Sequence, residues 1–228
     1  MDGKLKQLGK HQVKTAILVD GGFYRKRAKY LYGSKSPKER AEELTEYCYK
    51  HLHDQYEHRY LYRIFYYDCP PTDKNLYNPL TQKNEHLKKS EEYSWMNDFL
   101  DELKHRRKFA LRLGHLSESQ LAYYINPDAT KKLLKGELSI QDLTQQNLSL
   151  NIEQKGVDMR IGVDISSLAF KAQVNQIILI SGDSDFVPAA KQARREGIDF
   201  ILDPMGATIK SDLFEHIDGT VSYTHLRA

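Results

Sequence analysis

Two short, mostly apolar runs, each followed within three residues by both glycine and aspartate, constrain the fold of this chain most strongly. The first spans residues 15–19 (TAILV) and is followed by Asp20 and two glycines; the second spans residues 176–180 (QIILI) and is followed by Ser-Gly-Asp at residues 181–183. Short runs rich in β-branched residues are typical of strands covered on both faces. We therefore expect a buried parallel sheet.

The last third of the sequence alternates between helical and strand patterns. Helices are predicted over residues 157–172 and 187–196, and strands over residues 176–180 and 198–202. This alternation is typical of βαβ units, which produce a parallel sheet with helices on both faces. The predicted fold class is α/β, with an open, mostly parallel sheet.

The first half adds two strands and two amphipathic helices to this scheme. Strands are predicted over residues 60–67 and 109–113, a helix over residues 38–55 behind Pro37, and a second helix along the apolar stripe of Trp95, Phe99, Leu100 and Leu103. Two polar segments, near residues 72–89 and 117–154, are interpreted as insertions. One domain is therefore expected over residues 15–220, behind a leader at residues 1–14.

The composition narrows the class of protein and its surroundings. The chain has 228 residues, 40% of them hydrophobic, and its apolar runs fall short of the roughly 20 residues that a membrane helix needs. Cys48 and Cys69 give neither a disulfide framework nor a zinc spacing, so a reducing cytoplasm is the expected compartment. The net charge of +3 leaves any affinity for nucleic acid to local patches.

The last residues of the chain differ in character from the rest. Residues 221–228 (VSYTHLRA) resemble the translation of a sequencing adapter, so we interpret them as an artefact and expect the natural C-terminus to be missing. An ordinary polar tail is the alternative.

Aspartates stand where the predicted strands end and where one helix begins. Asp20 follows the first strand, Asp183 and Asp185 follow the strand at 176–180, and Asp158 opens the helix that leads into that strand. The carboxyl ends of parallel strands and the N-termini of the helices between them share one edge of a sheet. All four carboxylates are therefore expected to converge.

The helix at residues 157–172 allows a closer prediction. Asp158 falls within the edge of its apolar stripe, so a partly buried carboxylate is expected. Asp164 lies on the other flank, roughly 9 Å further along the axis, which fits a supporting role better than a ligand.

Clustered carboxylates repel one another and shift toward protonation unless a cation holds them. Oxygen ligands without thiolate or histidine favour Mg²⁺ or Mn²⁺. The chemistry expected of such a site is attack of an activated water on phosphorus. Each aspartate alone also has a structural interpretation, because Asp20 before Gly-Gly is a common turn and residues 183–185 are suited to capping the next helix.

Three sequence blocks carry a family resemblance. Residues 16–24 (AILVDGGFY), 154–158 (QKGVD) and 180–188 (ISGDSDFVP) resemble the signature blocks of the NYN domain, in its LabA-like branch. The resemblance implies a PIN-like, Rossmann-like fold and metal-dependent cleavage of RNA. It also implies metal-binding, catalytic aspartates at Asp20, Asp158 and Asp183, with Asp185 close behind, and an acidic residue at Asp68.

Other residues have two interpretations each. Lys155 and Arg25 are candidate contacts for a substrate phosphate, although solvated positions are equally expected for them. Ser181 either binds a water of the metal site or caps a turn by local backbone bonding, and the second is favoured.

The leading hypothesis is a metal-dependent ribonuclease that acts on single-stranded RNA and does not contact a membrane; a homodimer is compatible with the sequence. One alternative is a non-catalytic regulator that binds nucleic acid or protein with the same fold. Another is a phosphatase or nucleotide-processing enzyme. Against the last, Asp20 lacks an Asp-x-Asp pattern and the chain has no glycine-rich phosphate loop.

Overall fold

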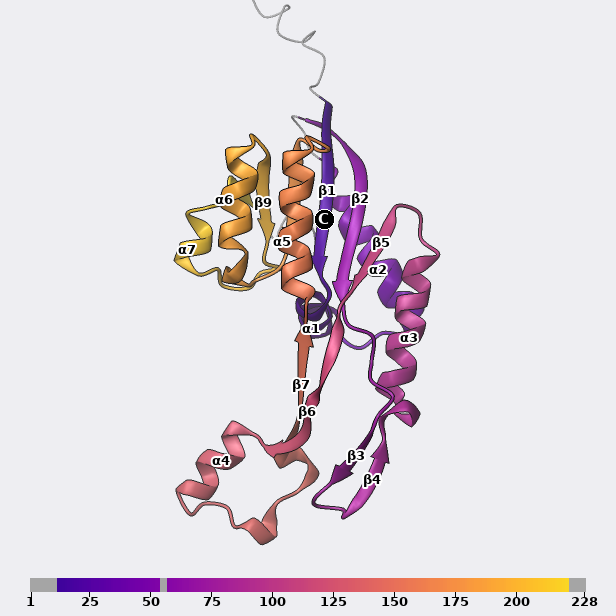
Figure 1. Cartoon of the computed structure of the whole chain (residues 1–228), viewed down its shortest axis with the longest axis vertical. Helices are drawn as coiled ribbons and strands as arrows, with labels where there is room; N and C mark the ends of the chain where they lie inside the picture. Colours follow the sequence, from indigo (N-terminus) through magenta and orange to yellow (C-terminus); the bar gives the residue numbers. More distant parts are fainter. Residues whose placement is uncertain (1–11, 54–56, 222–228) are drawn as a thin grey trace, which may run out of the picture.

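The computed structural model describes residues 12–53 and 57–221, and its centre is a six-stranded sheet (Figure 1). Every neighbouring pair of strands in this sheet is parallel. In spatial order the strands are β10 (Gly219–Thr220), β9 (Asp199–Asp203), β8 (Gln176–Ile180), β1 (Gln12–Asp20), β2 (His58–Asp68) and β5 (Phe109–Leu113). The predicted α/β class with an open parallel sheet is confirmed.

The order of the strands reverses at β1. The chain leaves β1 toward β2 and β5 on one side, and later returns to β8, β9 and β10 on the other. In doubly wound sheets this reversal opens a crevice at the carboxyl ends of the two strands that flank it. Here those strands are β1 and β8.

Helices cover both faces of the sheet (Figure 1). One face packs against α1 (Gly21–Tyr32), α2 (Pro37–Lys50) and α3 (Glu91–Lys104), and the other against α5 (Val157–Phe170), α6 (Val187–Arg195) and α7 (Ser211–Phe214). Strand residues alternate between the two cores, as for Leu18 and Val19 of β1. In the described part of the chain, no helix has both the length and the apolar content needed to cross a membrane.

The predicted elements agree with the structure best in the last third. Strand β8 has the predicted bounds, and the helix predicted over residues 157–172 ends two residues early at Phe170. In the first half, α2 stops at Lys50 instead of continuing to residue 55, and β2 begins at His58. The short elements α7 and β10 were not predicted, because neither is long enough to show a period.

The two segments interpreted as insertions form antiparallel hairpins outside the central sheet (Figure 1). The first consists of β3 (Asn75–Asn78) and β4 (Lys83–His86). The second consists of β6 (His115–Ile125) and β7 (Leu148–Lys155), with α4 (Pro127–Leu134) in the connection between them. Both hairpins extend away from the sheet beyond the carboxyl ends of its strands.

Polar contacts join the two hairpins. Asn78 Nδ2 donates to Gln145 Oε1 at 2.9 Å, and the Tyr123 hydroxyl donates to Glu85 Oε2 at 2.6 Å. The two hairpins, which are far apart in sequence, therefore contact each other beyond the carboxyl ends of the central strands.

Both predicted chain ends lie largely outside the described residues. The leader at residues 1–14 overlaps β1, which begins at Gln12. Of the tail at residues 221–228, only Val221 is described, and it packs against the core of the α1 face.

The start of α1 lies against the end of β2 with no space for a side chain. A Cβ at Gly21 would lie 2.5 Å from both Asp68 Oδ2 and the Tyr66 hydroxyl oxygen. At the next position, a Cβ on Gly22 would lie 3.5 Å from Gln154 Oε1, which is ordinary contact.

We therefore predict that two neighbouring substitutions differ in their effect on stability. Gly21→Ala should lower the free energy of unfolding by about 1–3 kcal/mol, because a buried methyl group would displace Asp68 and Tyr66. Gly22→Ala should change it by less than about 0.5 kcal/mol. Urea unfolding measures both, and equal stability of the two variants would contradict the packing described.

Candidate metal site at the strand ends

The carboxyl ends of the central strands lie level with one another. Val19 of β1 pairs with Ile180 of β8, and Asp20 pairs with Tyr67 of β2. The next residues along each strand, Ser181 and Asp68, therefore lie beside Asp20 at one edge of the sheet. The register alone brings three predicted residues together.

Asp20 is held in place by two hydrogen bonds. As N-cap of α1 it accepts the Phe23 backbone N–H at Oδ1, at 3.0 Å. Its Oδ2 accepts the Ser181 hydroxyl, also at 3.0 Å. The capping role foreseen for Asp20 is thus present, and it fixes the direction of the carboxylate.

The pKa of Asp20 is raised above its ordinary value, and burial is the largest cause. The hydrogen bonds from Phe23 and Ser181 lower it. The negative charges of Asp158 and Asp68 raise it further. Burial and neighbouring negative charge therefore both favour the protonated form of Asp20 in the absence of a cation.

Ser181 links the two loops. Its hydroxyl oxygen accepts the Asp183 backbone N–H at 3.3 Å while the hydroxyl itself donates to Asp20. Asp183 in turn accepts the Asp185 backbone N–H at Oδ1, at 3.1 Å. The local backbone bonding favoured for Ser181 is present, together with a side-chain contact to Asp20 that the sequence did not indicate.

Asp158 lies in the first turn of α5, which starts behind Gly156 in the left-handed conformation, at φ 78°. It is more exposed than the apolar stripe, whose members Ile161, Ile165 and Leu168 are buried as predicted, and it keeps only part of the burial expected for it. The pKa of Asp158 is raised, first by partial burial and then by the charges of Asp183 and Asp185.

Three of the four predicted aspartates line one pocket of about 430 Å³. Asp20, Asp158 and Asp183 come from three distant segments of the chain and share this pocket with Lys26 and Gln154. Asp185 is exposed next to them and acts on Asp158 through its charge. The structure thus brings the predicted cluster to one place.

Whether these residues fit a metal ion can be judged from their chemistry and spacing. Carboxylates that raise one another's pKa form the setting that a divalent cation neutralises. Among residues 12–53 and 57–221, however, no three acidic, histidine or cysteine side chains are close enough to hold one ion. Mg²⁺ commonly uses only one or two protein carboxylates and completes its shell with water and substrate phosphate. The pocket fits that open type of site and not a closed protein cage.

Asp68 and Arg25 form an ion pair with each other. Arg25 Nε lies 2.9 Å from Asp68 Oδ2, and its Nη2 lies 3.1 Å from Oδ1. The fully buried Asp68 also accepts the Tyr66 hydroxyl and the Cys69 backbone N–H, both at 2.8 Å. The phosphate contact predicted for Arg25 is therefore not supported by its geometry, because two of its nitrogens are bound to Asp68.

Two other predicted residues lie outside the pocket. Asp164 accepts the Tyr67 hydroxyl and Arg112 Nε, each at 2.9 Å, and does not line the pocket. Its supporting role is therefore directed at β2 and β5. Lys155 is exposed at the end of β7, next in sequence to Gln154 of the pocket.

Several pocket residues were not predicted as site residues. Gln154 donates to Asp68 Oδ1 at 3.3 Å, and Ala207 and Thr208 reach the pocket from the loop after β9. Lys26 had been considered only as part of a basic run. Lys26 lies about one helical turn after Gly22 in α1, and this spacing is the signal that could have placed both residues at the pocket.

Comparison with known proteins identifies the family. The NYN domain model matches residues 14–215, nearly the whole described chain. This chain belongs to the NYN domain family. NYN domains are PIN-like nuclease domains, and the observed sheet agrees with that fold.

Other similarities add little to this assignment. A crystal structure of a protein of unknown function from Vibrio parahaemolyticus superposes with a TM-score of 0.49 at 16% identity, covering 92% of this chain and 93% of the other. No curated protein matches the sequence. The NYN assignment thus depends on the family match.

We predict that the carboxylate cluster destabilises the metal-free NYN domain at neutral pH. A carboxyl group with a raised pKa holds its proton in the folded state at a pH where the unfolded chain has released it, so stability falls as the pH rises through these pKa values. Asp158→Asn should then raise the metal-free melting temperature at pH 7 by about 1–3 °C. Millimolar Mg²⁺ should raise that of the unmodified protein more than that of the variant.

The matched control is Asp128→Asn, which changes the same helical position in α4, away from the cluster. It should leave the melting temperature unchanged or slightly lower, because only a favourable interaction with the helix dipole is lost. The prediction is wrong if Asp158→Asn behaves in the same way as this control.

Proposed function

We propose that this protein is a metal-dependent ribonuclease that hydrolyses phosphodiester bonds at the pocket between β1 and β8. The observation that carries the proposal is the meeting of Asp20, Asp158 and Asp183 in one pocket of an NYN domain. The closer assignment to the LabA-like branch belongs to the same proposal and depends on the three sequence blocks at residues 16–24, 154–158 and 180–188.

In this proposal Asp20, Asp158 and Asp183 form the acidic pocket for Mg²⁺ or Mn²⁺, with one or two of them as direct ligands, and Asp185 adds negative charge beside them. A divalent cation bound there would supply the activation of water and the neutralisation of phosphate charge. Asp20 is suited to a ligand role because Phe23 and Ser181 fix its carboxylate before any ion binds.

Two features of the chain favour a phosphate at this position. Helices α1 and α5 both begin at the pocket, at Gly21 and Val157, so the positive ends of their dipoles lie there. Lys26 lines the same pocket, and in the described part of the chain no ion pair joins it to a carboxylate. We therefore assign to Lys26 the phosphate contact first sought at Arg25.

A specific observation favours a second candidate function. The absence of three converging ligands among the described residues fits a non-catalytic NYN domain that binds RNA without cutting it. Such a protein would bind RNA equally well in EDTA and with Mn²⁺, and it would produce no fragments. The nuclease requires turnover that EDTA abolishes.

We predict that purified protein cuts single-stranded RNA in Mn²⁺ or Mg²⁺ and that Asp183→Asn lowers the rate about 100-fold or more. A loss of this size is expected when a group that stabilises the transition state is removed. The measurement is the initial rate on a labelled single-stranded RNA.

Asp164→Asn serves as the control for this variant, since it changes an aspartate of α5 that lies outside the pocket. It should keep a rate within about threefold of the unmodified protein. Unchanged cleavage by Asp183→Asn, or equal losses in both variants, would refute the assignment.

We predict that Lys26→Gln weakens RNA binding and makes it less dependent on salt. One phosphate contact contributes a slope of about 0.7 in a plot of log affinity against log salt for a single strand, so the slope should fall by about that amount. Fluorescence anisotropy in EDTA measures it. Lys38→Gln, an exposed lysine of α2 away from the pocket, should leave the slope unchanged.

A further inference from the structure

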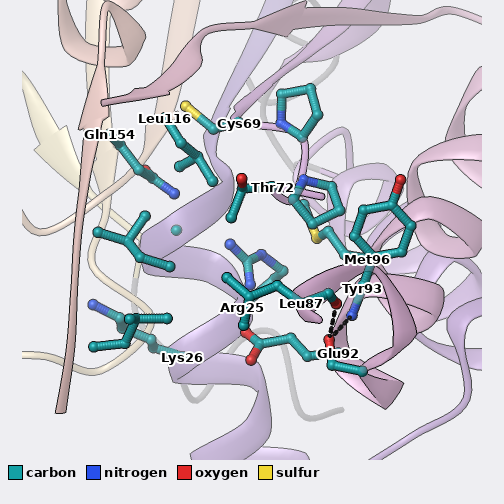
Figure 2. A pocket seen from close by; sticks show the side chains of 16 residues that line it. Arg25, Lys26, Cys69, Thr72, Leu87, Glu92, Tyr93, Met96, Leu116 and Gln154 are labelled. Atoms are coloured by element: carbon teal, nitrogen blue, oxygen red, sulfur yellow. Dashed lines mark hydrogen bonds between the residues drawn. The ribbon is translucent and has the colours of Figure 1, made fainter. Parts of the chain in front are cut away.

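A second pocket, of about 570 Å³, lies beside the aspartate pocket (Figure 2). Its walls come from α1, the segment after β2, α3 and the β6/β7 hairpin. Figure 2 shows Arg25 in the middle of the view, Gln154 and Leu116 on one side, and Tyr93 and Met96 on the other. Its volume lies within the roughly 300–1,000 Å³ of typical small-ligand sites.

The two pockets are adjacent and share part of their lining. Gly22, Lys26 and Gln154 line both of them. A chain whose phosphate lies at Lys26 beside the aspartates would therefore place its neighbouring group in the second pocket.

The lining of the second pocket favours a flat, uncharged group with polar edges. Leu87, Met96, Leu116, Leu150 and Ile152 supply apolar surface, and the half-buried ring of Tyr93 supplies an aromatic face. Such a combination suits a ring that stacks.

Apart from Lys26, which is assigned to the phosphate at the aspartates, the charged residues of this pocket argue against a second phosphate. The charge of Arg25 is balanced by its ion pair with Asp68. Glu92 adds a carboxylate to the lining, which would repel an anion. Thr72, Glu92 and Gln154 instead offer donors and acceptors of the kind that read the edge of a base.

We propose that the second pocket binds one nucleobase of an RNA strand, the base next to the phosphate that lies at the aspartates. This inference rests on the proposed action on RNA and adds a specificity site to it. The base has to leave its stack to enter, so the pocket selects single-stranded or locally unpaired RNA.

The test compares RNA decamers that each lack the base at one position. Binding is measured by fluorescence anisotropy in EDTA with the Asp183→Asn protein, so that no cleavage interferes. Removal of the base at one position should weaken binding about tenfold, because a stacked base is lost. In Asp183→Asn with Tyr93→Ala, the same removal should cost less than about twofold, because no ring remains to stack on.

Two further variants make the result specific. Tyr93→Phe keeps the ring and should retain the tenfold penalty, which separates stacking from misfolding of α3. Tyr49→Ala removes a tyrosine that is 40% exposed on α2 outside both pockets, and it should also retain the penalty.

The outcomes separate this inference from the proposed function. If RNA binds with a penalty at one position that depends on Tyr93 but is never cut, the base pocket stands and the nuclease assignment fails. If RNA is cut but the penalty is equal at all positions, or is unchanged in Tyr93→Ala, the nuclease stands and the base pocket is overturned. If no RNA binds, the base pocket is overturned, and if the unmodified protein also cuts no RNA in Mn²⁺, the nuclease assignment fails with it.

Discussion

The parallel pairing of β1 with both β2 and β8 is the constraint on which the rest of the structure depends. It makes β1 the point where the strand order reverses, and it sets the ends of the three strands level. Asp20, Asp68 and Ser181 meet because of this register and for no other reason. A slip of one residue in either pair would turn the side chains of a whole strand to the opposite face.

The aspartates at this edge of the sheet are of two kinds, one with a cationic partner and the others without one among the described residues. Asp68 is fully buried and is neutralised by Arg25, with Tyr66 and the Cys69 backbone N–H as further partners. Asp20 and Asp158 have no cationic partner among the described residues, and each has a raised pKa to which other aspartates contribute. A buried charge with a partner supports the structure, whereas the carboxylates that repel one another are the place where we propose that a divalent ion binds.

Much of the fold could be predicted from the sequence because its core elements are locally encoded. Strand β8 and helix α5 carry clear periods, and the convergence of strand-end aspartates follows from parallel topology. What each aspartate does could not be predicted, because its partner comes from elsewhere. Asp203 ends β9 as Asp20 ends β1, yet it is buried against Tyr47 of α2 and against His51, which follows that helix.

The strands of the hairpins also could not be predicted from the sequence. Leu148, Leu150 and Ile152 alternate along β7 as in a strand, but the partner strand is separated from them by α4, and the polar residues between them hide the signal. The β6/β7 hairpin supplies Leu116, Leu150 and Ile152 to the second pocket. The parallel sheet therefore positions the aspartate pocket, whereas the β6/β7 hairpin contributes to the second pocket beside it. Loops and insertions over a crevice commonly set specificity in this way. Membership of the family thus supports a class of chemistry, whereas the choice of substrate would depend on the walls of the second pocket, to which α1, α3 and the β6/β7 hairpin all contribute.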